Sequence, residues 1–246
     1  MREPVRYWLE GVFGYRNRGG MRVQLMLNVA VATQIGVQRG VHDYETMESL
    51  FAACDRQSDL YLDVLDAVIH QGRFLDAAAV TLQETLRAGY SVWSVAEDRK
   101  SLVRRVDAAA EASFAEALDA GGTAREELLQ AWEKAYGRNP DPSDCWDHSI
   151  KAVEAALVPV VVPDQAQPHL GHVVGQLDSQ PERWRLLLGH DVRPLLSMLR
   201  LLWPNPDRHG SPNERHLPSQ KEAEAVLALA VTIVQWVSKD VLQPRN

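Results

Sequence analysis

Apolar residues recur at helical spacing along most of the first ninety positions of the chain. The run 21–37 is dense enough in apolar side chains for a largely buried helix, and 43–54 places apolar residues three or four positions apart. Ser58 is a favourable N-cap for a helix that Gly72 ends, and 75–87 is rich in Ala and Leu. This part of the sequence therefore predicts four consecutive helices.

The periodicity changes at Ser91, where polar and apolar residues partly alternate. The segments 91–95 and 101–106 could pair with each other, and the polar turn 97–100 lies between them. Alternation of this kind is typical of strands that have one buried face. We expect a small β-hairpin between Ser91 and Val106.

Helical periodicity returns after the hairpin. Thr123 and Glu126 form the pattern of a capping box, and so do Ser219 and Glu222 at the start of a long terminal helix that reaches about Val241. The complete set of helices expected here is 108–120, 123–136, 144–158, 170–177, 192–203 and 220–241.

The cluster of Gly, Asn and Pro residues at 137–143 is the clearest interruption in the sequence. We expect the domain boundary there, with an N-terminal helical region over 1–137, including the hairpin, and a C-terminal helical domain over 138–246. The predicted fold class is mostly α.

Composition and charge limit the classes of function. An apolar fraction of 46% and a charged fraction of 24% are typical of a soluble globular protein, and no apolar run reaches the length of about 20 residues that spans a membrane. The first twenty residues lack the apolar core of a signal peptide, so we expect a cytoplasmic protein. A net charge of −7 argues against sequence-blind coating of nucleic acid, although it is compatible with a local basic pocket.

The polar loop after Trp203 is the most informative stretch of the sequence for candidate chemistry. Two Arg-His neighbourhoods, at 208–209 and 215–216, lie in it beside Asn, Asp and Gly residues. Polar loops between rigid helices commonly carry binding or catalytic residues. From composition alone, a solvated loop with incidental charges remains the alternative.

Four segments together resemble the C-terminal HEPN-like domain of AbiJ-type abortive-infection proteins. They are a helix bearing Ala-Val-Glu at 144–154, a Leu-Gly helix start at 169–177, an Arg-His-Gly turn at 203–210 and a closing Ala-rich helix at 222–236. The resemblance covers the chain from about Pro140 onward. It implies a HEPN-like helical bundle and a role in defence against phage.

The resemblance also implies an activity, because many HEPN domains are ribonucleases that need no metal or other cofactor. A His near neutral pH can take a proton from an RNA 2′-hydroxyl and return one to the leaving oxygen, and an Arg can hold the phosphate. The implied catalytic residues are Arg208 with His209 or His216, and Asn205, Asp207 and Glu154 are the implied substrate-binding residues.

The spacing of these residues departs from the family pattern of an Arg and a His about four to six residues apart. Seven residues separate Arg208 from His216, and none separates Arg208 from His209. A non-catalytic HEPN-like module that binds RNA, a nucleotide or a protein is therefore the alternative function, and a structural helical adaptor is a third.

Other candidate sites carry weaker signals. His169 and His172 have the spacing of a metal pair but no third ligand at a convincing distance along the sequence, so we interpret them as helix-start histidines and expect no metal. The resemblance implies a homodimer, and Trp236, Val241 and Leu242 provide apolar surface for it. RNA is the expected ligand, and the N-terminal region could bind a protein partner.

Overall fold

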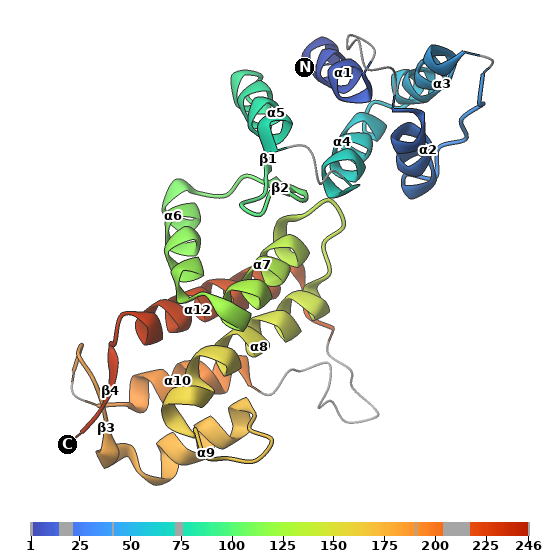
Figure 1. Cartoon of the computed structure of the whole chain (residues 1–246). Helices are drawn as coiled ribbons and strands as arrows, with labels where there is room; N and C mark the ends of the chain where they lie inside the picture. Colours follow the sequence, from blue (N-terminus) through green and yellow to red (C-terminus); the bar gives the residue numbers. More distant parts are fainter. Residues whose placement is uncertain are drawn as a thin grey trace. The chain divides into compact units, whose positions relative to one another are not determined.

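The computed structural model describes residues 2–14, 22–40, 42–71, 76–189, 191–203 and 217–245. These residues are mostly helical and include two small antiparallel strand pairs, as Figure 1 shows. The chain divides into two compact units, Met1–Arg105 and Val106–Asn246, hereafter the first and second units. Among the described residues, no helix combines the length and apolar character needed to span a membrane.

The first unit is a group of helices packed around one apolar core. Its elements are α1 (Arg2–Phe13), α2 (Val23–Ala32), α3 (Asp43–Arg56), α4 (Leu60–Gln71), α5 (Asp76–Ala88), β1 (Trp93–Val95) and β2 (Leu102–Arg104). Helix α1 was not among the predicted helices, yet its side chains Leu9 and Phe13 are fully buried. The core therefore includes the N-terminal segment as well as the predicted helices.

The predicted hairpin is confirmed, and side chains from two helices position it. Strands β1 and β2 pair antiparallel, with Trp93 opposite Arg104. The Gln83 side chain on α5 accepts a hydrogen bond from the Val95 backbone N–H at 2.7 Å, and Asp66 on α4 accepts one from the Leu102 N–H at 2.5 Å. A two-stranded ribbon is only marginally stable alone, so these helix contacts account for its presence.

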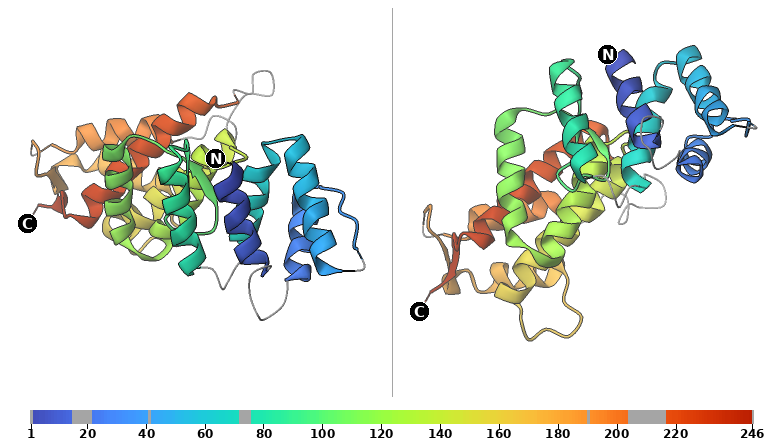
Figure 2. Two further views of the ribbon diagram at one scale, coloured as in Figure 1. Left: turned by 90° about the horizontal axis from the view of Figure 1, so that it is seen from above. Right: turned by 45° about the horizontal axis from the view of Figure 1, so that its top comes forward.

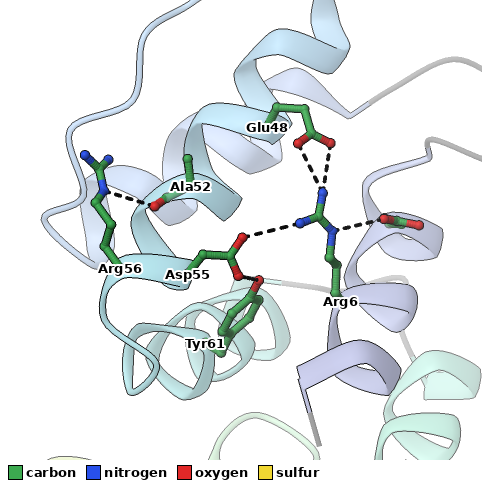
Figure 3. Close-up of polar contacts among 7 residues, drawn as sticks. Arg6, Glu48, Ala52, Asp55, Arg56 and Tyr61 are labelled. Carbon is green, nitrogen blue, oxygen red and sulfur yellow. Dashed lines mark hydrogen bonds and ion pairs between the residues drawn. The ribbon is translucent and has the colours of Figure 1, made fainter.

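Arg6 links three helices of the first unit (Figure 3). Its Nη2 lies 3.0 Å and 3.1 Å from the two carboxylate oxygens of Glu48 on α3, and its Nη1 lies 3.5 Å from Asp55. Asp55 in turn accepts a hydrogen bond of 2.8 Å from the Tyr61 hydroxyl on α4. The guanidinium carbon also lies 4.6 Å from the centre of the Phe51 ring. This arrangement joins α1 to α3 directly and to α4 through Asp55.

The second unit contains the longest helices, which Figure 2 shows from two further directions. Its elements are α6 (Ala108–Ala117), η1 (Leu118–Ala120), α7 (Gly122–Tyr136), α8 (Pro142–Val161), α9 (Leu170–Ser179), η2 (Pro181–Arg183), β3 (Trp184–Leu186), α10 (Arg193–Leu202), α12 (Gln220–Ser238) and β4 (Leu242–Pro244). Helices α7, α8 and α12 pack against one another.

The two units meet in sequence between Arg105 and Val106, whereas the sequence suggested a boundary at 137/138. The cluster of Gly, Asn and Pro residues forms a tight turn between two antiparallel helices of one unit. Lys134 on α7 pairs with Asp144 on α8 at 2.7 Å, and Glu127 pairs with His148 at 2.6 Å, so the two helices pack side by side. Residues that interrupt helices mark a turn as readily as a domain linker.

The start of α7 differs from the sequence prediction, whereas the start of α12 agrees with it. Helix α7 begins at Gly122 and its N-cap, Gly121, has no side-chain hydrogen bond, so the capping box predicted from Thr123 is wrong. Both glycines have positive φ, which lets the helix begin before Thr123. The capping box of Ser219 and Glu222 is confirmed.

The C-terminal helix also ends before the predicted Val241. Asp240 has a φ of 53°, and the chain then reverses into β4. Strand β4 pairs antiparallel with β3, so that Leu242 lies opposite Leu186 and is 5% exposed. The part of the expected dimer surface that Leu242 was to provide is thus buried within its own unit.

Candidate histidine site at the start of helix α9

The site is built where α8, the first turn of α9 and the C-terminal end of α10 come together. The Trp146 indole on α8 donates a hydrogen bond of 2.8 Å to the Leu202 carbonyl, which fastens the end of α10 to α8. The Trp203 N–H donates to the Leu199 carbonyl at 2.8 Å. These bonds fix Trp203 at the C-terminal end of α10.

Glu154 and His169 satisfy the free N–H groups at the start of α9. Glu154, half-buried on α8, accepts a hydrogen bond from the Leu170 N–H at 2.6 Å. His169 is the N-cap, and its Nδ1 accepts a hydrogen bond from the Gly171 N–H at 3.1 Å. A carboxylate near a helix N-terminus is also stabilised by the helix dipole. In this structure Glu154 therefore caps the N-terminus of α9.

The imidazoles of His169 and His172 lie against each other. Their ring centres are 3.8 Å apart, and the indole of Trp203 lies 6.0 Å from the His169 ring at a small interplanar angle. Because Nδ1 of His169 accepts the Gly171 N–H, neutral His169 carries its hydrogen on Nε2, which leaves that atom as a donor. The interpretation of these two residues as helix-start histidines is confirmed for His169.

A polar atom of His172 is left without a partner. Its Nδ1 is closed to solvent and has no hydrogen-bond partner in the described part of the chain. Burying such an atom without a partner costs about 1–3 kcal/mol. No group of three or more His, Cys, Asp or Glu side chains among the described residues could hold a metal ion.

Gly171 is required by the close approach of these rings. A Cβ on Gly171 would lie 2.8 Å from Cε1 and 2.9 Å from Nδ1 of His169, and 3.3 Å from Nε1 of Trp203. Any side chain there would displace the His169 ring. The Leu-Gly helix start in the sequence thus has a steric reason in this structure.

A second polar cluster fastens α7 to α8. His148 lies between two carboxylates, with its Nδ1 2.6 Å from Glu127 and its Nε2 3.9 Å from Asp144. The hydrogen bond from Lys134 lowers the pKa of Asp144 and raises the pKa of Lys134 itself. Lys134 pairs with Asp144 and Glu127 pairs with His148 across the two helices, so the cluster is explained by helix packing.

The other residues predicted for the site lie outside the described residues. They are Asn205, Asp207, Arg208, His209 and His216. Among the predicted site residues, Glu154 alone lies in the described part of the chain. Three residues that the sequence analysis did not assign to the site, His169, His172 and Trp203, lie with it at the start of α9. Their signal in the sequence was that His169 and His172 lie in the segment 169–177, and Trp203 in the segment 203–210, of the resemblance to the HEPN-like domain.

No family model matches the chain, and no curated protein or solved structure matches it either. The resemblance to AbiJ-type proteins stays a prediction.

Proposed function

We propose that the second unit acts on RNA, and that the chain is an abortive-infection endoribonuclease that uses Arg208 together with His209 or His216. One observation supports this proposal among the described residues. Two imidazoles in contact, a capping carboxylate and an indole gather at the point where the chain enters the segment carrying Arg208. Imidazoles are the side chains best suited to proton transfer near neutral pH.

The proposed reaction is transfer of the phosphate to the neighbouring 2′-oxygen. A neutral histidine removes the proton from the 2′-hydroxyl, the oxygen attacks phosphorus, and the bond from phosphorus to the 5′-oxygen breaks. A protonated histidine returns a proton to that leaving oxygen. The products are a 2′,3′-cyclic phosphate and a 5′-hydroxyl, and Arg208 stabilises the charge on the phosphate oxygens as they change geometry.

The test is cleavage of labelled RNA by the purified chain, with and without a chelator. We expect cleavage in both conditions, products that end in a cyclic phosphate, and no cleavage where the 2′-hydroxyl is replaced by hydrogen. Arg208→Ala should slow the reaction roughly a thousandfold while leaving the fold intact. His209→Ala and His216→Ala then identify the proton-transfer residue, since only one within hydrogen-bond reach matters.

A matched control is available on α10. Arg200 pairs with Asp178 at 2.8 Å, and its side chain is 53% exposed, so Arg200→Ala removes a guanidinium outside the site. It should cleave RNA like the parent. If Arg208→Ala is folded and as active as Arg200→Ala, this ribonuclease assignment is wrong.

The alternative function is a non-catalytic HEPN-like module that binds RNA, a nucleotide or a protein. One observation favours it, because Glu154 and Nδ1 of His169 both serve as caps for α9. Groups engaged in this way support the helix and need not take part in chemistry. Retention of RNA by the folded chain without any cleavage would select this alternative.

A further inference from the structure

A cavity of about 430 Å³ lies in the second unit, and Glu154, His169, His172 and Trp203 are not among the residues that line it. It is formed by the C-terminal end of α8 and the following turn, by α9, and by the strand pair β3–β4. Its polar lining residues are Asp164, Gln165, Gln176, Arg183 and Arg245. A volume of this size is typical of sites for small molecules.

Backbone pairing holds the two arginines of the cavity opposite each other. In the β3–β4 register Trp184 faces Pro244, and the Arg245 N–H donates a hydrogen bond of 2.7 Å to the Arg183 carbonyl. The pairing therefore brings two guanidinium-bearing residues to the same edge of the cavity, and Asp191 also interacts electrostatically with Arg245.

The charge of the cavity is opposite to that of the chain as a whole. Two arginines and one carboxylate, Asp164, line it, in a chain whose net charge is −7. Arg183 keeps a hydrogen bond of 2.7 Å to Gln180, which helps to fix its guanidinium. Planar guanidinium groups match phosphate oxygens in geometry and in charge.

The wall of the cavity also contains a buried indole. Trp184 is 7% exposed, and its Nε1 has no hydrogen-bond partner in the part of the chain that the structure describes. Because this atom is closed to solvent, an acceptor reaches it only if the indole shifts when the cavity is filled. The indole N–H is thus a local reporter of occupancy.

We propose that this cavity binds a phosphate monoester carried on a small polar body, with Arg183 and Arg245 on the phosphate and the amides of Gln165 and Gln176 on the body. Such a group could come from a free sugar phosphate or from the 5′ end of an RNA chain. The proposal is independent of the ribonuclease proposal, because binding here requires no cleavage.

The experiment follows the indole N–H resonances of the full chain labelled with ¹⁵N-tryptophan. The chain has seven tryptophans, and Trp184→Phe identifies the resonance of Trp184. The probes are ribose 5-phosphate, a short 5′-phosphorylated RNA with 2′-O-methyl groups, inorganic phosphate and ribose. We expect the Trp184 resonance to shift with at least one of the two monoesters, and the one that binds more tightly identifies the source.

Variants test the assignment of the two arginines. Arg183→Gln combined with Arg245→Gln should weaken monoester binding at least tenfold. Arg185→Gln is the matched control, since Arg185 lies on β3 two residues after Arg183 and donates to the Gln243 side chain at 2.8 Å. This variant should bind like the parent. The proposal is overturned if neither monoester shifts the Trp184 resonance, if inorganic phosphate or ribose binds as tightly as the monoesters, or if the double variant binds unchanged.

Discussion

At the scale of single residues, the site depends on how closely side chains approach the first turn of α9. His169 caps this turn, His172 lies against His169, and the indole of Trp203 lies next to Gly171. Glycine leaves room for the imidazole to reach the backbone N–H that it caps. Position 171 therefore links the stability of α9 to the geometry of the histidine pair.

Gly171→Ala should displace the His169 ring and break the cap. We expect a loss of about 1 kcal/mol in the free energy of unfolding, the usual contribution of an N-cap, measured by urea denaturation. Gly175→Ala is the matched control, because a Cβ there meets no atom within 4 Å. That variant should gain up to about 1 kcal/mol from the higher helix propensity of alanine. Equal stability of the two variants would show that the His169 cap contributes nothing.

At the scale of elements, polar side chains hold helices together in both units. Arg6 joins α1 to α3 in the first unit, and the group of Glu127, Lys134, Asp144 and His148 joins α7 to α8 in the second. Each ion pair is partly exposed and contributes little alone. Their effect comes from several contacts that converge on one residue.

Arg6→Lys keeps the positive charge but cannot form the forked contacts with Glu48 and Asp55. We expect the first unit to lose about 1 kcal/mol of stability. The buried thiol of Cys54 reports this loss, since burial raises its pKa to about 11 and it reacts at pH 8 only after local opening. A loss of about 1 kcal/mol should speed labelling of Cys54 roughly fivefold.

The chain provides two controls for this measurement. Cys145 lies in the second unit, and burial raises its pKa to about 12, so its labelling rate in Arg6→Lys should match the parent. Arg2→Lys changes an exposed arginine on the same helix and should leave both rates unchanged. If Cys54 reacts equally fast in Arg6→Lys and the parent, the Arg6 contacts do not stabilise the first unit.

The raised pKa values of the Cys54 and Cys145 thiols also determine whether the stability of the fold rises or falls with pH. The unfolded thiols lose their protons near the ordinary value of 9.0, whereas the folded thiols keep theirs to higher pH. The unfolded state therefore binds fewer protons above about pH 9, and stability falls as the pH rises. Labelling at pH 8 stays below this range.

At the scale of the whole molecule, the homodimer remains a prediction. Trp236 and Val241 are half-buried, whereas Leu242 is buried against Leu186 in its own strand pair, so the apolar surface left for a partner is smaller than the sequence suggested. We still expect light scattering at micromolar concentration to give twice the chain mass of 27.5 kDa, because the resemblance to HEPN-like domains implies a two-fold dimer. A mass of one chain would contradict this prediction.

Local sequence was sufficient for most elements. Apolar spacing located nine of the helices to within three residues, and it located α2, which ends at Ala32, five residues before the predicted end. Alternation located the hairpin of β1 and β2. Both patterns arise from neighbours along the chain. The capping box at Ser219 was recognisable for the same reason, since its partners are three residues apart. The classification as mostly helical followed from these patterns.

Contacts between distant segments could not be read from the same patterns. Strand β3 pairs with β4 across more than fifty residues, and each has three residues, which is too short to produce a clear alternation. The cluster of Gly, Asn and Pro residues at 137–143 predicts a domain linker from sequence alone. In the structure it connects α7 to α8, and these two helices pack against each other. Only long-range packing distinguishes a helix turn from a linker.

The candidate site shows the same division. The residue types at 169–172 and at 203 were visible in the sequence, and so was Glu154 on its helix. Their meeting at the start of α9 depends on how α8, α9 and α10 pack, and on the bond from Trp146 to the Leu202 carbonyl. Side-chain chemistry is a property of the sequence, whereas the distance between two side chains on different helices is a property of the fold.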